Sequence, residues 1–269
     1  MATTTLRMSK HHGLGNDFLV ALEAENPGLR PDAVLARRLC QRHHGIGADG
    51  MMFGLVGDAR GIDLRMVLFN ADGSEAAISG NGIRCLAQAA LRRTGRRDGA
   101  ILIDTAAGLR SLTSVPTGDD ATDLLRVEMG AVTDGPSLTS DAETYPARRR
   151  TILEIGNPHL ILLVDSLEGV DPAVDGPALE AGFPDGINVH FMTSEGPDVV
   201  RLLHWERGAG VTEACGSGAT VAAVAAHRWG LVGDRVTVRM PGGEAVVDIG
   251  ETVALSGPAV LVASIEVHT

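Results

Sequence analysis

Two short glycine-rich segments of this chain match each other, and an alanine-rich run follows each of them. The first segment reads Ser79-Gly-Asn-Gly and the second reads Cys215-Gly-Ser-Gly. A polar side chain, Asn70 or Glu206, lies nine residues before each segment. Because further glycine-bearing markers recur around both segments in the same order, the sequence predicts two homologous halves.

The predicted fold is α+β, with two pseudo-symmetric halves that each wrap strands around a central apolar helix. Residues 80–91 and 216–229 are the expected central helices, because small and apolar side chains dominate them. Residues 64–69 and 199–205 are expected to be strands that lead into the two glycine loops. Further short apolar runs between Gly, Pro and Asp residues predict strands. These runs cover residues 100–103, 124–129, 151–155, 160–164, 236–240 and 245–249.

A boundary between the halves is expected near residue 125. The N-terminal half then comprises residues 1–125, joined by a last strand near 258–269, and the C-terminal half comprises residues 126–257. An exposed helix is expected over residues 31–43. Polar stretches rich in turn-forming residues predict loops or linkers at 113–120 and 133–145.

Charge and hydropathy exclude several functional classes. The chain has 34 acidic and 23 basic side chains, a net charge of −11, and no basic cluster of the kind that nucleic-acid binding requires. No apolar run approaches the ~18–20 residues of a membrane span. The first twelve residues contain no apolar core of a secretory signal. We therefore expect no nucleic-acid partner, no membrane partner and a cytoplasmic location.

The lysine and cysteine content further limits the cofactors and metal sites that the chain can have. Pyridoxal-phosphate enzymes use a Schiff-base lysine, and Lys10, the single lysine, lies near the N-terminus where it is a poor candidate. Cys40, Cys85 and Cys215 lie far apart without a C-x-x-C spacing. Neither a disulfide framework nor a zinc site is therefore predicted. We expect no cofactor and no metal.

Each glycine loop is expected to begin a helix, where free backbone N–H groups and the helix dipole attract a carboxylate or phosphate. A single G-x-G turn is more often a packing feature, and free cysteines are more often buried hydrophobes, as we interpret Cys40 and Cys85. Two matched loops favour a functional anion site instead. At a helix N-terminus the pKa of the Cys215 thiol is expected to fall from about 8.5 toward neutrality.

Seven segments spread over nearly the whole chain form a recognisable ordered set. They are HGLGNDF (12–18), HHGIGADG (43–50), FNADGSEAAISGNGIRC (69–85), GNPH (156–159), FPDGINV (183–189), ERGAGVTEACGSGAT (206–220) and PGG (241–243). In these segments the chain resembles the diaminopimelate epimerases, of the cofactor-independent amino-acid racemase and epimerase superfamily that includes proline racemase. The resemblance implies a duplicated α+β fold with the active site at the interface between the halves, often in a homodimer.

The resemblance also implies a two-base reaction on a small-molecule amino-acid substrate, most directly the interconversion of LL- and meso-diaminopimelate. One thiolate removes the α-proton while an opposing thiol protonates the other face. Cys215 matches one catalytic cysteine, and His159 and Glu206 resemble neighbours that orient or polarise the catalytic pair. Outside this context, the His would be interpreted as a turn residue and the Glu as a surface charge. The implied substrate-binding residues are Asn16, Asn70, Gly80, Asn81, Asn157, Asn188, Glu206, Arg207, Gly216 and Ser217.

Ser79 stands where the family has its other catalytic cysteine, while Cys85 aligns with a separate, non-catalytic position. A serine hydroxyl is a far weaker acid than a thiol and needs an activating base. Three interpretations stay open: a native serine activated by a neighbour or by substrate, an engineered replacement, or a different reaction such as loss of a β-substituent. The alternatives to epimerisation are thus a related isomerase or dehydratase of another amino acid, and a catalytically impaired amino-acid-binding homologue. A smaller departure is Gly50, where some relatives carry a side chain that reaches the substrate.

Overall fold

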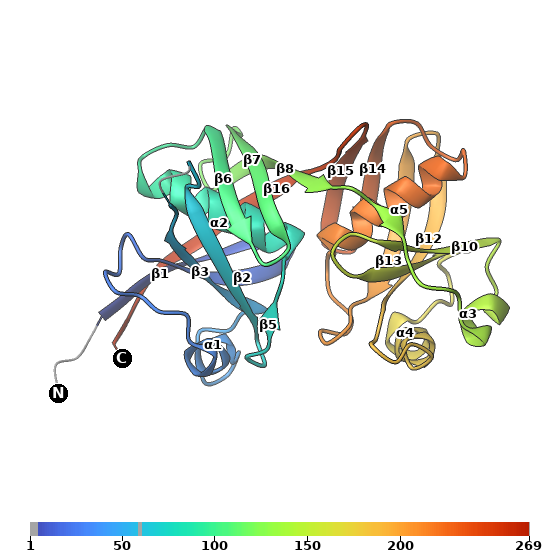
Figure 1. Cartoon of the computed structure of the whole chain (residues 1–269), viewed down its shortest axis with the longest axis horizontal. Helices are drawn as coiled ribbons and strands as arrows, with labels where there is room; N and C mark the ends of the chain where they lie inside the picture. Colours follow the sequence, from blue (N-terminus) through green and yellow to red (C-terminus); the bar gives the residue numbers. More distant parts are fainter. Residues whose placement is uncertain (1–4, 59–60, 269) are drawn as a thin grey trace. The chain divides into compact units, whose positions relative to one another are not determined.

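A computed structural model describes residues 5–58 and 61–268 of the chain (Figure 1). Within these ranges it contains sixteen strands and five helices. They belong to two compact units: the first runs up to Val127 and resumes at Gly257, and the second comprises Glu128–Ser256. Among the described residues, no helix has the length and apolar character that crossing a membrane requires.

The first unit contains a closed barrel. Its strands pair in the order β1–β2–β3–β4–β6–β7–β8–β16, and β16 pairs with β1 to close the sheet. Closure removes the unpaired edges that an open sheet would expose. The strands are β1 (Thr5–Gly13), β2 (Asn16–Leu22), β3 (Gly50–Val56), β4 (Leu64–Asn70), the short β5 (Glu75–Ala76) beside β4, β6 (Gly99–Thr105), β7 (Gly108–Pro116), β8 (Thr122–Gly130) and β16 (Val253–His268).

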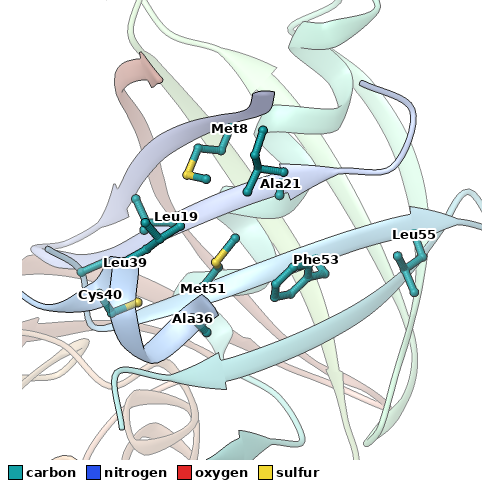
Figure 2. Packing of buried hydrophobic residues seen from close by; sticks show 11 residues of the cluster. Met8, Leu19, Ala21, Ala36, Leu39, Cys40, Met51, Phe53 and Leu55 are labelled. Carbon is teal, nitrogen blue, oxygen red and sulfur yellow. The ribbon is translucent and has the colours of Figure 1, made fainter. Parts of the chain in front are cut away.

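Two helices pack against this barrel. Helix α2 (Gly80–Arg93) contacts β1, β2, β3, β6 and β7, and eleven of its residues are buried. Helix α1 (Ala33–Cys40) begins after Asp32, whose carboxylate accepts hydrogen bonds from the amides of the first turn. It covers a second apolar cluster, in which Leu39 and Cys40 pack with residues of β2 and β3 (Figure 2).

The second unit contains a sheet in the order β15–β14–β13–β12–β11–β10–β9, with the first residues of β16 paired to β15. Helix α5 (Gly216–Arg228) contacts β10 to β15, and ten of its residues are buried. Its strands and remaining helices are β9 (Thr133–Asp134), β10 (Arg149–Glu154), β11 (Pro158–Leu163), β12 (Asn188–Gly196), β13 (Val199–Trp205), β14 (Arg235–Met240), β15 (Gly243–Ile249), α3 (Ser140–Thr144) and α4 (Pro172–Glu180).

Most of the expected elements are confirmed within a few residues. The helices expected at 80–91 and 216–229 are α2 and α5, and the strands expected at 64–69 and 199–205 are β4 and β13. The helix expected over 31–43 is shorter, because Asp32 caps its start and it ends at Cys40. The loops expected at 113–120 and 133–145 are partly wrong. Strand β7 pairs with β8 as far as Pro116, and β9 and α3 lie within the second stretch.

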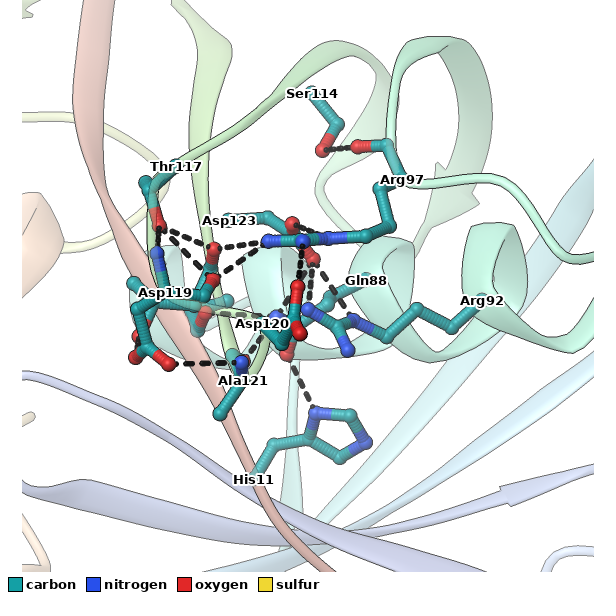
Figure 3. A network of polar contacts seen from close by, with 12 residues as sticks. His11, Gln88, Arg92, Arg97, Ser114, Thr117, Asp119, Asp120, Ala121 and Asp123 are labelled. Carbon is teal, nitrogen blue, oxygen red and sulfur yellow. Dashed lines mark hydrogen bonds and ion pairs between the residues drawn. The ribbon is translucent and has the colours of Figure 1, made fainter.

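A buried polar cluster joins α2 to β8 in the first unit (Figure 3). The Asp123 carboxylate is 1% exposed and accepts hydrogen bonds of 2.8 Å from Gln88 Nε2, Arg92 Nε and Arg97 Nε. The Gln88 carbonyl oxygen lies 2.8 Å from Nδ1 of His11, so that ring nitrogen is the donor. Burial lowers the pKa of His11 to about 4, and the ring is therefore neutral at pH 7.

We predict that Asp123→Asn lowers the free energy of unfolding by about 3 kcal/mol, because two arginines then keep their charges without a buried counter-ion. Urea denaturation measures the loss. Asp120→Asn is the matched control: this carboxylate is fully exposed and pairs with the same Arg97 at 3.0 Å. It should cost less than about 1 kcal/mol. Equal losses in the two variants would contradict the assignment of Asp123 as the counter-ion.

Candidate active site

Cys215 caps the N-terminus of α5 in the second unit. Its Sγ accepts a hydrogen bond from the Gly218 amide at 3.3 Å and lies 3.6 Å from the hydroxyl oxygen of Ser217. A Cβ on Gly218 would lie 2.1 Å from Cε1 of His190, so only glycine allows this close approach of the helix to the ring. Because Gly216 and Ser217 begin the helix, their backbone N–H groups have no partner within it.

Ser79 caps α2 in the first unit with the same local geometry. Its hydroxyl accepts from the Gly82 amide at 3.1 Å. The backbone angles φ and ψ are −133° and 124° at Ser79 and −121° and 109° at Cys215. Serine is among the preferred N-cap residues, so this hydroxyl stabilises the helix whatever its chemical role.

The expectation that the helix terminus lowers the pKa of Cys215 is wrong. Burial raises the pKa of this thiol well above its usual range, and the adjacent Glu206 carboxylate raises it further by its charge and as a hydrogen-bond acceptor. The Ser217 hydroxyl and the Gly218 amide act in the opposite direction but contribute less than burial and the Glu206 charge together. The resting thiol is therefore protonated near neutral pH.

Glu206 is the end of a chain of hydrogen bonds that sequence reasoning missed. The Thr212 hydroxyl donates to Oε1 of Glu206, and Nε2 of His204 lies 2.9 Å from the same hydroxyl oxygen. Since the hydroxyl gives its proton to the carboxylate, it accepts from His204, which fixes the Nε2–H tautomer. Burial lowers the pKa of His204 to about 4. His204 and Glu206 point to one side of the chain because they are two residues apart at the end of β13.

His159 lies in a second buried chain of polar contacts in the same unit. Its Nε2 is 2.9 Å from the Asn157 carbonyl oxygen, and its Nδ1 is 2.8 Å from Nε2 of His190. The amide oxygen only accepts, so His159 donates from Nε2 and accepts from His190 at Nδ1. Burial, with the charge of Arg207 as the next cause, lowers the pKa of His159 to about 3. The ring is neutral at pH 7 and orients the side chain of Asn157.

Two of the predicted substrate-binding residues in the second unit, Asn188 and Arg207, are held by hydrogen bonds to backbone groups. The Asn188 side chain accepts from the Arg207 amide at 3.0 Å and donates to the Pro158 carbonyl at 3.2 Å. The exposed Arg207 guanidinium donates to the Asp185 carbonyl at 2.7 Å. These contacts hold three loops, each of which carries a predicted site residue.

In the first unit, Asn81 donates to the Asn16 carbonyl oxygen at 3.3 Å, and Asn16 in turn donates to Asp49 at 2.8 Å. The structure thus joins Asn16 to the first turn of α2, where Ser79 and Gly80 lie. The Asn70 side chain instead donates to the Ser74 hydroxyl at 3.0 Å within the turn after β4. Direct side-chain contacts thus join Asn16 and Asn81 in the first unit.

Solved structures of a hydroxyproline epimerase and of a PhzF-family protein share the fold. The chain superposes on a hydroxyproline epimerase from Agrobacterium vitis with a TM-score of 0.71 at 16% identity, over 98% of this chain and 92% of that one. A PhzF-family phenazine biosynthesis protein from Bacillus anthracis gives a TM-score of 0.73 at 17% identity, over 98% and 99%. At these identities the likeness establishes a mixed α/β fold of the epimerase and PhzF type.

Sequence comparison is more specific, and the chain belongs to the diaminopimelate epimerase family. The model of that family matches residues 8–134 and 151–262. The diaminopimelate epimerase of Methanothermobacter thermautotrophicus is 38% identical over 257 residues, which cover 90% of this chain and 89% of the relative. That of Synechocystis is 37% identical over 259 residues, covering 90% and 91%. The expected resemblance is confirmed, and the chain is an isomerase of the racemase and epimerase class.

We predict that Thr212→Val lowers kcat at least tenfold, because the half-buried Glu206 carboxylate and the buried His204 ring each lose a partner. Thr212→Ser is the matched control, since it keeps the hydroxyl and should retain activity within about threefold. Steady-state kinetics of the purified variants test both. Similar losses in the two variants would show that the methyl packing of Thr212 matters rather than its hydrogen bond.

We predict that the free energy of unfolding falls as the pH is lowered, because four histidines are buried as neutral rings. The pKa values of His11, His159, His190 and His204 are lowered by burial, whereas the unfolded chain takes up these protons near pH 6.5. The unfolded state therefore binds more protons below pH 6.5, and the free energy of unfolding decreases as pH falls from there toward 4. The test variant is His204→Gln, which cannot take up a proton but keeps an N–H donor for the Thr212 hydroxyl.

The His204→Gln variant should reduce the slope of the unfolding free energy against pH by up to about 1.4 kcal/mol per pH unit. Denaturation between pH 7.5 and about 5 measures this slope. Replacing the exposed His44 with Asn should leave the slope unchanged. A wild-type stability that is constant over this range would contradict the assignment of neutral buried rings.

Proposed function

We propose that this protein interconverts LL- and meso-diaminopimelate in the cytoplasm, as a step of lysine biosynthesis and without a cofactor. Membership of the diaminopimelate epimerase family supports the substrate. The observation that carries the chemistry is the contact of the buried Cys215 thiol with the Glu206 carboxylate at a helix N-terminus. A proton donor, its acceptor and free backbone amides are there within one loop.

The proposed architecture is a pair of pseudo-symmetric halves divided near residue 125, each with strands around a central helix. The substrate is proposed to bind at the interface between the halves, and the protein is proposed to act as a homodimer. Both glycine loops then bind the same α-carboxylate. Their proposed donors are the amides of Gly80, Asn81, Gly216 and Ser217, which stabilise the charge that develops when the α-proton leaves.

Cys215 is proposed to act in both directions of the reaction. As a thiol, the state that burial favours, it donates its proton to the α-carbon. In the reverse direction the thiol proton moves to the Glu206 carboxylate, and the resulting thiolate takes the α-proton. The Thr212 hydroxyl donates to the same carboxylate and orients it for this exchange.

Ser79 is proposed to carry the proton on the opposite face, with His159 polarising the catalytic pair. Its hydroxyl needs help from the substrate or a neighbour to form an alkoxide, which would make the reaction slow. Ser79 is also the one observation that favours the alternatives, a related isomerase or dehydratase of another amino acid or an impaired binding homologue.

The distal end of the substrate is proposed to contact the remaining polar residues of both units. Arg207 suits a carboxylate, since its guanidinium offers several donors, and Glu206 suits an ammonium group. Amide side chains can serve either group. They are Asn16, Asn70, Asn157 and Asn188.

Proton exchange in deuterated water tests this function directly. Incubation with LL- or meso-diaminopimelate should yield the other isomer with deuterium at the α-carbon, as followed by NMR and mass spectrometry. Cys215→Ala should abolish both signals. Absence of exchange and of interconversion with the wild-type protein would contradict the proposal, and keto-acid formation from other amino acids would favour a dehydratase.

Ser79→Cys is the companion test of the missing thiol. A thiol is the better acid and base near neutral pH, so this variant should raise kcat/KM by about 100-fold or more. Ser79→Ala, which removes the hydroxyl and the cap, should lower it. A fall in the cysteine variant would show that the serine is suited to a different reaction.

A further inference from the structure

Arg84 is a fully buried arginine in α2, five residues after the cap Ser79. Its Nη1 donates to the Gly80 carbonyl at 2.9 Å, its Nη2 to the Asn81 side-chain oxygen at 2.6 Å, and its Nε lies 3.4 Å from the Pro258 carbonyl. All three acceptors are uncharged. In the part of the chain that the structure describes, no carboxylate pairs with this guanidinium.

The surrounding backbone closes tightly on the guanidinium group. A Cβ on Gly13 would lie 3.1 Å from Arg84 Nη2, and a Cβ on Gly257 would lie 3.1 Å from Arg84 Cζ. Burial lowers the pKa of Arg84 to about 10, so the side chain remains a cation at neutral pH. A buried cation without a counter-charge is costly to the folded state, and perturbed charged groups of this kind are common at functional sites.

Two of the three hydrogen bonds of Arg84 end on Gly80 and Asn81, the residues that follow the cap Ser79 in the first glycine loop. The peptide group between Gly80 and Asn81 accepts from Arg84 at its carbonyl, and its N–H is a proposed donor to the substrate carboxylate. A charged donor on the carbonyl polarises the peptide and strengthens that N–H as a donor. The other terminal nitrogen of Arg84, Nη2, donates to the side-chain oxygen of Asn81 and orients this amide, whose nitrogen donates to the Asn16 side-chain oxygen at 3.3 Å.

Helix α5 has a neutral counterpart at the matching place. Thr220 lies five residues after Cys215, is also fully buried, and its hydroxyl donates to the Gly216 carbonyl at 2.9 Å. The first carbonyl of each helix therefore receives a side-chain donor four residues later. In α2 this donor carries a positive charge, and in α5 it does not.

We propose that Arg84 is the positioning residue that makes the first glycine loop a carboxylate site, supplying the positive charge that the bound α-carboxylate neutralises. This inference rests on the proposed function. Arg84 acts through the peptide of Gly80 and through Asn81 rather than by touching the substrate. The free protein then bears an uncompensated charge, and substrate binding relieves it.

Arg84→Met separates this role from a purely structural one. An apolar side chain of similar length removes the buried charge, so the melting temperature of the free variant should be unchanged or higher. KM for diaminopimelate should rise at least about tenfold, because hydrogen bonds strengthened by a charge are lost. The rise in melting temperature that saturating substrate produces in the wild-type protein should shrink in parallel.

Thr220→Val is the matched control, since it removes the equivalent neutral donor from α5 and should change KM less than about threefold. Arg84→Lys keeps the charge but loses the hydrogen bond from Nη2 to the Asn81 side chain. Its KM should therefore lie between those of the wild-type protein and the Met variant. If the Met variant does not fold, a Lys variant of wild-type stability with a raised KM supports the role.

Three results would overturn the proposal: a folded Met variant with KM within twofold of wild type, a folded Met variant whose melting temperature and activity fall together, or a stable Lys variant with unchanged KM. Inactivity of the wild-type protein on diaminopimelate would instead refute the proposed function, and the two failures are thus distinguishable.

Discussion

In the proposed mechanism, the contact between the Glu206 carboxylate and the buried Cys215 thiol governs the chemistry of the second unit. Burial and the neighbouring negative charge both favour the protonated thiol. The carboxylate is oriented by the Thr212 hydroxyl, and that hydroxyl is fixed by the neutral ring of His204. The thiol and the His204 ring are both buried, and the carboxylate is the adjacent proton acceptor, which suits an enzyme that takes a proton from carbon and returns it.

The two helix caps share a backbone geometry but differ in their electrostatic surroundings. A cation, Arg84, lies behind the first loop, whereas the second loop has the anion Glu206 beside its cap. Positive charge stabilises a bound carboxylate, and negative charge keeps a thiol protonated. We therefore propose that the two loops, which share a cap geometry, have different tasks. The replacement of a thiol by Ser79 falls in the loop where the charge favours an anion.

Local signals made much of the fold and part of the site predictable. The helices α2 and α5 and the strands β4 and β13 follow from apolar runs next to glycine. Strand β3 was not predicted, because it is buried on both faces and lacks the alternation that marks a half-exposed strand. The pKa of Cys215 was predicted in the wrong direction, since the helix dipole is a local term while burial and the Glu206 charge arise from tertiary packing. His204 belongs to none of the seven segments, and Thr212, although it lies in the segment 206–220, gave no sign that its hydroxyl contacts Glu206.

Titration of the Cys215 thiol tests the central relation between burial, Glu206 and proton transfer most directly. The ultraviolet absorbance of the thiolate, taken as the difference between the wild-type and Cys215→Ala proteins, follows its ionisation. We predict that the thiolate forms only above the usual range of a cysteine, and that Glu206→Gln moves the midpoint to lower pH. A thiolate already present at neutral pH, or a midpoint unaffected by Glu206→Gln, would contradict the proposed control of the Cys215 thiol by burial and Glu206.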